Sequence, residues 1–549
     1  MSLLDWLVLC AYFLIVAVIG VLSSLKVKGT QAYFLGHRRF SPWVMVGQSL
    51  SVGTHPEMIV AVSGAVYTSG ASAIWYQWKN LFATPFYWIM APVFRRSRRT
   101  TTAELVEDRF GAQMAAIYTV FALSYFTITT ATLLKGAGKV VNQALGGEVG
   151  ANQVVIAMTA IFVLYSFAGG LVATAWNMLV QGVLIVTLSF LLIPLGWPLV
   201  GGMREMKSLL PADRFSVVTP AGIDLWTIVM LTLNGLIGIM AMPHVMASVG
   251  TGRDEISCRR GFFYGNLVKR FCTVGWTIVG LLVAALVAKG TFGVYSLADP
   301  EDAFGFAARH LLFPGLLGLL IACVLAAGMA ACSAFMVDAG ALFTQSLYRR
   351  YLVTGATDGH YLWVGRVSGL SVTLLAVLYA LFLIDRVLYS FLLTETMATY
   401  IGISIVGGLI WQRANRWGAI ASLAAAFSTN FLLYHLQDRR LDAWDPNVFL
   451  FSLSAGVGAL VLFSLLSRPE PEATTRDFLE RLELSSDGGA NGITEQNRQP
   501  LLLVSLLGLR QAARPVGIYR RFRVEWLGLL QGFLLVFALV GLTWMILRR

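Results

Sequence analysis

The stretch SLSVGTHPE (residues 49–57) lies inside an apolar run from residue 43 to residue 68, which is long enough to cross a bilayer as a helix. Pro56 removes a backbone donor and Gly53 loosens the chain beside it, so the helix is predicted to break there. His55 and Glu57 flank this break at membrane depth, where such groups are costly unless they face a cavity. The stretch therefore predicts a polar binding site inside a membrane protein.

A second interrupted run lies five spans later, between residues 224 and 248. Its centre reads GLIGIMAMPH (residues 235–244), so His244 directly follows Pro243. An ordinary proline kink is the alternative at either position alone. One interrupted helix at the start of each of two five-helix sets is typical of a secondary transporter built from inverted repeats, which binds its solute near the midplane.

The composition agrees with a membrane protein. The chain has 549 residues, of which 57% are hydrophobic and 13% charged, whereas a soluble domain has roughly a quarter charged residues. We predict an all-α integral membrane protein with about fourteen transmembrane helices. The expected spans are 4–23, 43–68, 72–94, 113–134, 152–168, 174–199, 224–248, 267–289, 311–345, 362–384, 388–411, 417–436, 447–466 and 524–546.

Basic residues cluster after the odd-numbered spans, as at residues 95–99 and 253–260, whereas residues 299–302 after the eighth span are acidic. By the positive-inside rule, the N-terminus is predicted to lie outside a multi-pass protein of the plasma or inner membrane, and an even span count places the C-terminus with it. This distribution explains the net charge of +12 without a nucleic-acid partner. The five cysteines show no paired spacing and are expected to be buried apolar residues.

The expected organisation has six parts: 1–42 with the first span, repeats at 43–199 and 200–412, two spans within 413–466, a cytoplasmic linker at 467–522, and the last span at 523–549. In the linker, Asp477–Leu484 is amphipathic, and the apolar run Pro500–Leu509 is too short to span and is expected at the membrane interface. The chain shows no nucleophile motif, metal-ligand cluster or phosphate loop, so neither an enzyme nor a bound cofactor is expected.

Over residues 1–466 the sequence resembles the sodium/solute symporter family, which contains sodium–glucose and sodium–proline symporters. The resemblance rests on short motifs in the same order: YFLGHR (33–38), TTAELVEDRFG (101–111), YSFAGGLVA (165–173), AAGM (326–329) and WQRAN (411–415). It implies a LeuT-type fold with a five-plus-five inverted repeat (spans 2–6 and 7–11). It also implies alternating-access symport of a small polar organic solute with Na⁺ as the coupling ion.

The resemblance assigns a sodium site to the broken second span and the ninth span, and its matching positions are Ser49 and Val52, by backbone carbonyl, and Ala327. Ser333 is a nearby hydroxyl that is added to this sodium set, although it faces a different side of the helix. Two hydroxyl residues of the family pattern are replaced by Ala330 and Ala331. Met178 stands in a segment where the family usually has a carboxylate. Methyl groups supply none of the oxygens that sodium needs.

Three coupling schemes remain open. Sodium binds through carbonyls and another oxygen, such as that of Thr54 or Ser333. Alternatively, a proton replaces sodium on Glu57 together with His55 or His244, because a buried carboxylate can titrate near neutral pH. In the third scheme coupling is absent, and the chain is a facilitator or a non-transporting sensor.

The solute site is predicted where polar residues and helix breaks meet, with a weak preference for a sugar or polyol from the length of the segment 53–65. Glu395 joins the set because hydroxyls flank it within a span. Lys79 is interpreted as reaching the headgroups, and Asp338 lies near the cytoplasmic exit of its span. The predicted solute-binding residues are Gly53, Thr54, His55, Glu57, Gln77, Gly238, His244 and Glu395. The oligomeric state is left open.

Overall fold

The computed structural model describes residues 1–24, 33–34, 39–220, 223–384, 386–439, 444–484, 499–505 and 522–548. Within these ranges the chain is helical apart from turns, short connections and an isolated bridge between Phe40 and Gly252. Nine described helical segments are long and apolar enough to cross a membrane, and three shorter apolar helices accompany them. The long helices are α8 (Ala112–Ala144), α13 (Glu255–Ala288), α15 (Leu316–Phe343), α16 (Asp358–Phe382), α17 (Val387–Ile410), α18 (Arg416–Leu436), α19 (Pro446–Leu466), α23 (Arg523–Arg548) and part of α9 (Ala151–Val200).

Both predicted helix breaks are present. The second span consists of α3 (Pro42–Gly53) and α4 (Pro56–Ser69), with Thr54 and His55 in extended conformation between them. The seventh consists of α11 (Leu225–Gly238) and α12 (Pro243–Val249). In each case a proline occupies the first position of the second helix, where its missing N–H leaves no hydrogen bond unmade.

The third predicted span, 72–94, is not one helix. It contains the short helices η2 (Ala71–Ile74), α5 (Trp75–Trp78) and η3 (Thr84–Phe86), followed by α6 (Tyr87–Ser97). Lys79 lies where α5 ends and is 1% exposed. The interpretation that Lys79 reaches the headgroups is therefore wrong, because the irregular backbone keeps this segment inside the protein.

The fifth and sixth predicted spans both lie in α9. Gly146, just before α9, contacts Arg309, and Gly196, near its end, contacts Leu311 of α14 (Ala303–Leu311). Since both ends lie beside the same helix, α9 reverses direction and crosses the molecule twice. Its two apolar stretches, Ala151–Leu164 and Ala175–Val200, match the two predictions.

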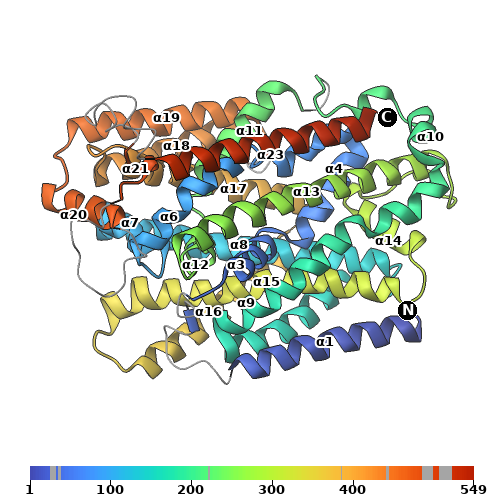
Figure 1. Ribbon diagram of the computed structural model, residues 1–549, viewed down its shortest axis with the longest axis horizontal. Coiled ribbons are helices and arrows are strands. Elements are labelled where there is room, and N and C mark those ends of the chain that lie inside the picture. Colours follow the sequence, from blue (N-terminus) through green and yellow to red (C-terminus); the bar gives the residue numbers. More distant parts are fainter. Residues whose placement is uncertain are drawn as a thin grey trace.

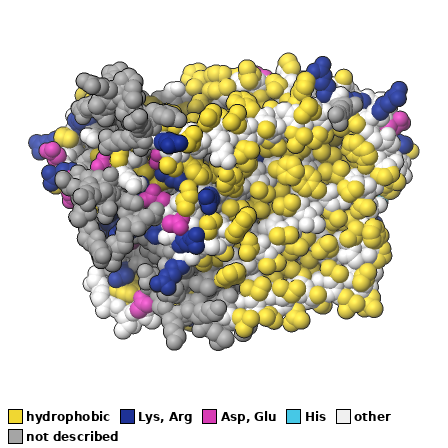
Figure 2. Space-filling model, in the orientation of Figure 1, with side chains coloured by type: hydrophobic (Ala, Val, Ile, Leu, Met, Phe, Trp, Pro, Cys, Tyr) yellow, Lys and Arg dark blue, Asp and Glu magenta, His cyan; other side chains and the backbone are white. Residues whose placement is uncertain are grey.

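Two helices form the centre of the bundle. α15 is buried along almost its whole length among α1 (Leu3–Ser24), α8, α9 and α16, and α13 packs against α3, α4, α6 and α9. The outer helices expose leucine, phenylalanine and valine, and Figure 2 shows a broad hydrophobic belt between ends that carry the charged side chains. Such a belt is expected of a surface that faces lipid.

The two termini lie at the same end of the molecule, and α7 (Thr102–Phe110), α12 and α20 (Glu472–Glu483) lie toward the other (Figure 1). α20 overlaps the predicted amphipathic piece and buries Phe478 and Leu482. The described part of the predicted interfacial run, residues 500–505, includes α21 (Leu502–Ser505) and buries its leucines against α6 and α17. The rest of that run lies outside the described residues.

Candidate functional site

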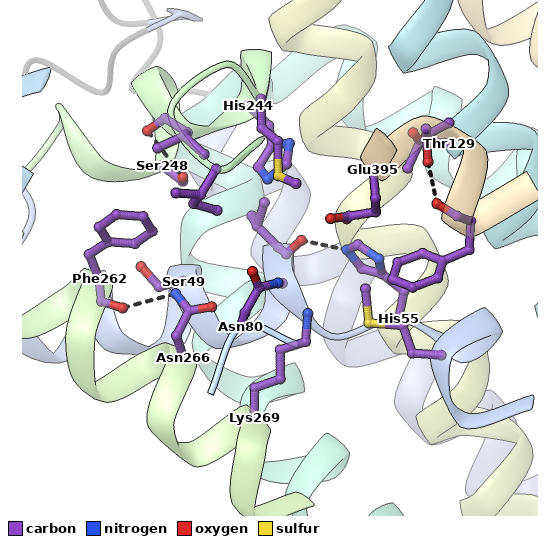
Figure 3. Close-up of a pocket in the computed structure, with 18 of the residues that line it drawn as sticks. Ser49, His55, Asn80, Thr129, His244, Ser248, Phe262, Asn266, Lys269 and Glu395 are labelled. Atoms are coloured by element: carbon purple, nitrogen blue, oxygen red, sulfur yellow. Dashed lines mark hydrogen bonds between the residues drawn. The ribbon is translucent and has the colours of Figure 1, made fainter. Parts of the chain in front are cut away.

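A cavity lies where the first helix break meets α8, α12, α13 and α17. Proline and glycine position it, because the interrupted helices leave room that a continuous helix would fill. Seven predicted site residues line the cavity: Ser49, Val52, Gly53, His55, Glu57, His244 and Glu395. Figure 3 shows His55, His244, Glu395 and Lys269 around this common space.

The other predicted residues lie outside the cavity wall. Thr54 is fully buried in the break, and its hydroxyl has no hydrogen-bond partner among the residues described. Gln77 is also buried, and its backbone carbonyl accepts a hydrogen bond from Arg270 Nη1 at 2.9 Å. Gly238 packs against Thr399 and the backbone of Glu395. Ala327 and Ser333 lie inside α15.

His55 and Glu57 form a pair beside the break. Glu57 Oε1 lies 2.8 Å from His55 Nδ1, and the other ring nitrogen of His55 contacts the Val52 carbonyl. Because a carbonyl only accepts, His55 Nε2 carries a proton. A second proton then lies between Nδ1 and the carboxyl group. The pair therefore holds a proton whether it is written as an imidazolium with a carboxylate or as two neutral groups.

Three buried cations surround the cavity, and the predicted site residues included none of them. Lys79 pairs with Glu395, joining the end of α5 to α17. Lys269 points from α13 toward the space between Asn80 and His55 (Figure 3). Its amine has no hydrogen-bond or ion-pair partner among the residues that the structure describes. Arg270 follows it and is 1% exposed.

Sequence reasoning missed Lys269 and Arg270 because the eighth span was predicted from residue 267, where the apolar run begins. The helix starts earlier, at Glu255, so both cations lie about 20 Å along α13. The apolar run begins twelve residues after the start of α13 because other parts of the protein cover the first turns of this helix, which therefore need not be apolar. A long helix with basic residues in the first turn of its apolar run is the signal that would have indicated them.

His244 contributes a ring rather than a charge. It stacks on Tyr125 with ring centroids 6.0 Å apart and lies 5.3 Å from the Phe335 ring. Its Nδ1 atom is buried and has no hydrogen-bond partner within the described part of the chain. The imidazole therefore lines the cavity with one ring nitrogen that no described residue engages.

The residues at the family's sodium site do not fit a sodium ion well. The side chains of Ala330 and Ala331 supply no oxygen, and the Ser333 hydroxyl accepts a hydrogen bond from Ser166 Oγ at 2.6 Å. The Val52 carbonyl is occupied by His55. In addition, a β-carbon placed on Gly53 would lie 3.8 Å from Lys269 Nζ, so a cation here would be close to an ammonium group.

The segment around Met178 also lacks a carboxylate near this position. The Met178 carbonyl accepts a hydrogen bond from Ser51 Oγ at 2.7 Å, and the neighbouring Asn177 side chain is buried without a hydrogen-bond partner in the described residues. This contact joins α9 to α3 through neutral groups. At Asn177 and Met178, the described contacts therefore supply no carboxylate in place of the one that the family pattern has.

Comparison with known proteins identifies the group to which the chain belongs. Residues 33–425 match the model of the sodium:solute symporter family. The osmoregulated proline transporter OpuE of Bacillus subtilis is 26% identical over 76% of this chain and 86% of its own length. The sodium/proline symporter of Escherichia coli is 25% identical over 86% of this chain and 95% of its own length.

Among solved structures, a Na⁺-coupled sialic acid symporter in a substrate-bound, outward-open state superimposes with a TM-score of 0.74 at 16% identity. The match covers 85% of this chain and 98% of that one, and it shows that the two share a fold. The chain belongs to the sodium:solute symporter family, and it is a secondary transporter of a small solute on the LeuT-type fold.

Proposed function

We propose that this transporter carries a small solute with a carboxylate group, such as an amino acid, and binds that group with Lys269 and Arg270. The observation that carries the proposal is the uncompensated positive charge of the central cavity. Among the described residues, the acidic side chains near Lys79, Lys269 and Arg270 are Glu57 and Glu395.

The two acidic groups are already engaged. Glu395 pairs with Lys79, and Glu57 with His55. Arg270 donates to the Gln77 carbonyl, which is neutral, and its Nε atom has no partner in the described chain. A buried charge without a partner costs several kcal/mol, so a carboxylate entering beside Lys269 and Arg270 would relieve that cost.

A zwitterion also suits the other side of the cavity. The Glu57 Oε2 atom is buried, accepts no hydrogen bond from the described part of the chain, and is available for an amine. The proline transporters and the sialic acid symporter above handle solutes that contain a carboxylate, which agrees with this chemistry. A neutral sugar or polyol, weakly favoured by segment length, would leave the cations uncompensated.

The test is counterflow of radiolabelled solutes in proteoliposomes, using proline, other amino acids, sialic acid and glucose. Exchange of one or more carboxylates and none of glucose is expected. Lys269→Met keeps the length of the side chain but removes its charge, and it should weaken solute binding by about 10- to 100-fold. Lys269→Arg should retain more affinity than Lys269→Met.

The matched control is Lys289→Met, at the outer end of the same helix, where the amine contacts only the Leu199 carbonyl on the surface. It should exchange solute like the wild type. Glucose exchange without carboxylate exchange would overturn the proposal. Failure of every solute would instead favour the sensor alternative.

The proposed orientation keeps the N-terminus outside. The basic segments after the odd-numbered spans gather at the end that contains α7, α12 and α20, where Arg96 pairs with Glu255 and Arg416 with Glu470. Cysteine labelling from outside intact cells at Ser2→Cys, with Thr475→Cys as the inner control, tests this directly. Labelling of Thr475→Cys but not of Ser2→Cys would show that the orientation is the opposite of the one proposed.

A further inference from the structure

A small cavity lies at the inner end of α15, outside the central site. It is lined by Asp338, by Thr100, Thr101 and Thr102 before and at the start of α7, and by Pro243 at the start of α12, with apolar side chains closing the rest. Its volume is about 10 Å³, room for one water-sized particle. From the sequence, Asp338 near the end of its span could be either a hydrated surface residue or a functional one. In the structure it is only 8% exposed.

Asp338 has no hydrogen-bond or ion-pair partner in the described part of the chain. The nearby Thr102 hydroxyl is also buried and meets the geometry of a hydrogen bond with none of the described residues. It lies close to the Tyr118 hydroxyl, which donates its own proton to the Ala241 carbonyl. An isolated carboxylate at this depth costs several kcal/mol unless a cation neutralises it. Within the described residues, the cavity therefore places a carboxyl group without a hydrogen-bond or ion-pair partner beside the Thr102 hydroxyl.

Asp338 has a defined relation to the family's sodium site. It follows Ala331 by seven residues, so it lies on the same face of α15, two turns or about 10 Å further along. The helix that lost two hydroxyl ligands thus carries a carboxylate on the same face, closer to the predicted cytoplasmic end.

Aromatic rings separate the two levels. Phe335, one turn before Asp338, lies 5.4 Å from Phe126 and 5.9 Å from the His55 ring, measured between centroids. Phe126 also lines the Asp338 cavity. The Phe335 ring thus contacts His55 and His244 of the central cavity on one side and Phe126 of the Asp338 cavity on the other, so these two phenylalanines form a barrier between the cavities.

We propose that Asp338 and Thr102 form a cation site for Na⁺ on the inner side of this barrier, in place of the family's weakened site. The carboxylate and the hydroxyl supply three oxygens of the hard type that Na⁺ prefers. Thr100 and Thr101 line the same cavity in the chain just before α7, and they are the expected source of further oxygens. The proposal rests on the sodium coupling of the family and not on the identity of the solute.

The experiment is equilibrium binding of radioactive Na⁺ to the purified full-length protein in detergent, without solute, at constant ionic strength with choline as the replacement cation. Asp338→Asn keeps the side-chain shape and removes the charge. It should weaken Na⁺ binding by at least about tenfold. Thr102→Val retains the carboxylate and should weaken binding by a smaller factor.

The matched control is Ser333→Ala, which removes the nearest hydroxyl of the family's site from the same helix. It should bind Na⁺ within about twofold of the wild type, because this hydroxyl is engaged by Ser166. The opposite pattern, loss in Ser333→Ala and none in Asp338→Asn, would overturn the assignment. Size-exclusion profiles show whether each variant is folded, and Thr102→Val carries the test if Asp338→Asn is not.

A second arm separates Na⁺ from a proton at the same carboxylate. Solute counterflow by the wild type is measured with Na⁺ or choline and with the pH held equal on both sides. A protein that binds no Na⁺ but exchanges a carboxylate solute would overturn the Asp338 sodium site while leaving the proposed function intact. A protein that binds Na⁺ through Asp338 but exchanges no carboxylate solute would support the sodium site and overturn the proposed function.

Discussion

The two interrupted helices have similar backbones and opposite chemistry. Between α3 and α4 the break contains Thr54 and His55, with Glu57 in the first turn of α4. Between α11 and α12 it contains Ile239, Met240, Ala241 and Met242, and its Ala241 carbonyl is satisfied by the Tyr118 hydroxyl. Proline and glycine produced a helix break twice, but only the first break exposes polar side chains to the cavity.

The difference shows that a broken helix is a scaffold and not by itself a binding site. At the first break, unpaired atoms of Thr54 and Glu57 remain and Lys269 lies nearby. At the second, apolar side chains and one tyrosine fill the gap, and the polar chemistry comes from neighbours, chiefly His244 and Glu395. The second break therefore shapes the cavity, whereas the first supplies its polar groups.

The largest expected effect concerns the ion pair beside the second break. Glu395→Gln leaves the Lys79 amine buried without its carboxylate, and should lower the free energy of unfolding by about 3–5 kcal/mol. Adding Lys79→Met should recover much of that loss, because the uncompensated charge is then gone. Thermal unfolding in detergent of both single variants and the double variant measures the coupling. Additive losses would mean that the pair contributes no mutual stabilisation.

The glycines that end α3 and α11 provide a matched comparison. A β-carbon on Gly238 would lie 2.8 Å from Thr399 Oγ1, so Gly238→Ala should destabilise the protein by about 1–3 kcal/mol. The nearest atom to a β-carbon on Gly53 is 3.7 Å away, an ordinary contact, so Gly53→Ala should leave stability almost unchanged. Unfolding temperatures of the two variants test this. Equal losses would contradict the tight packing of the second break.

The smallest effect lies in the loop around Asp302, which packs on α4. Burial, followed by the nearby charge of Asp299, raises the pKa of Asp302 to about 6. Because the folded pKa is above the usual 3.8, the ionised form is disfavoured in the folded protein, and stability should increase as the pH falls from about 7 to 4.

For this partly exposed group, the gain is about 1 kcal/mol after screening by solvent. Asp302→Asn should be more stable than the wild type at pH 7 and should lack this part of the pH dependence. Unfolding curves between pH 4 and pH 7 compare the two proteins. If the stabilities of the wild type and the variant changed in parallel between pH 7 and pH 4, a group other than Asp302 would be responsible for the pH dependence.

Part of the site could be predicted because it follows from local chemistry. Pro56 and Pro243 break helices wherever they stand in an apolar run, and Glu57 and Glu395 are conspicuous because carboxylates are rare at membrane depth. The partners of these groups could not be read in the same way. Lys79 and Glu395 are 316 positions apart, and only folding shows that they form a pair.

The sequence alone determined that this chain is a bundle of membrane helices with two breaks, since hydropathy and proline act over a few residues. Tertiary structure decided which breaks carry charge and which basic residues lie inside. Lys269, Arg270 and Asp338 resemble residues at helix ends when only the apolar runs are considered. They are buried because neighbouring helices extend beyond those runs and cover them. The charge of the central cavity likewise depends on contacts between distant segments, such as the pair of Lys79 and Glu395.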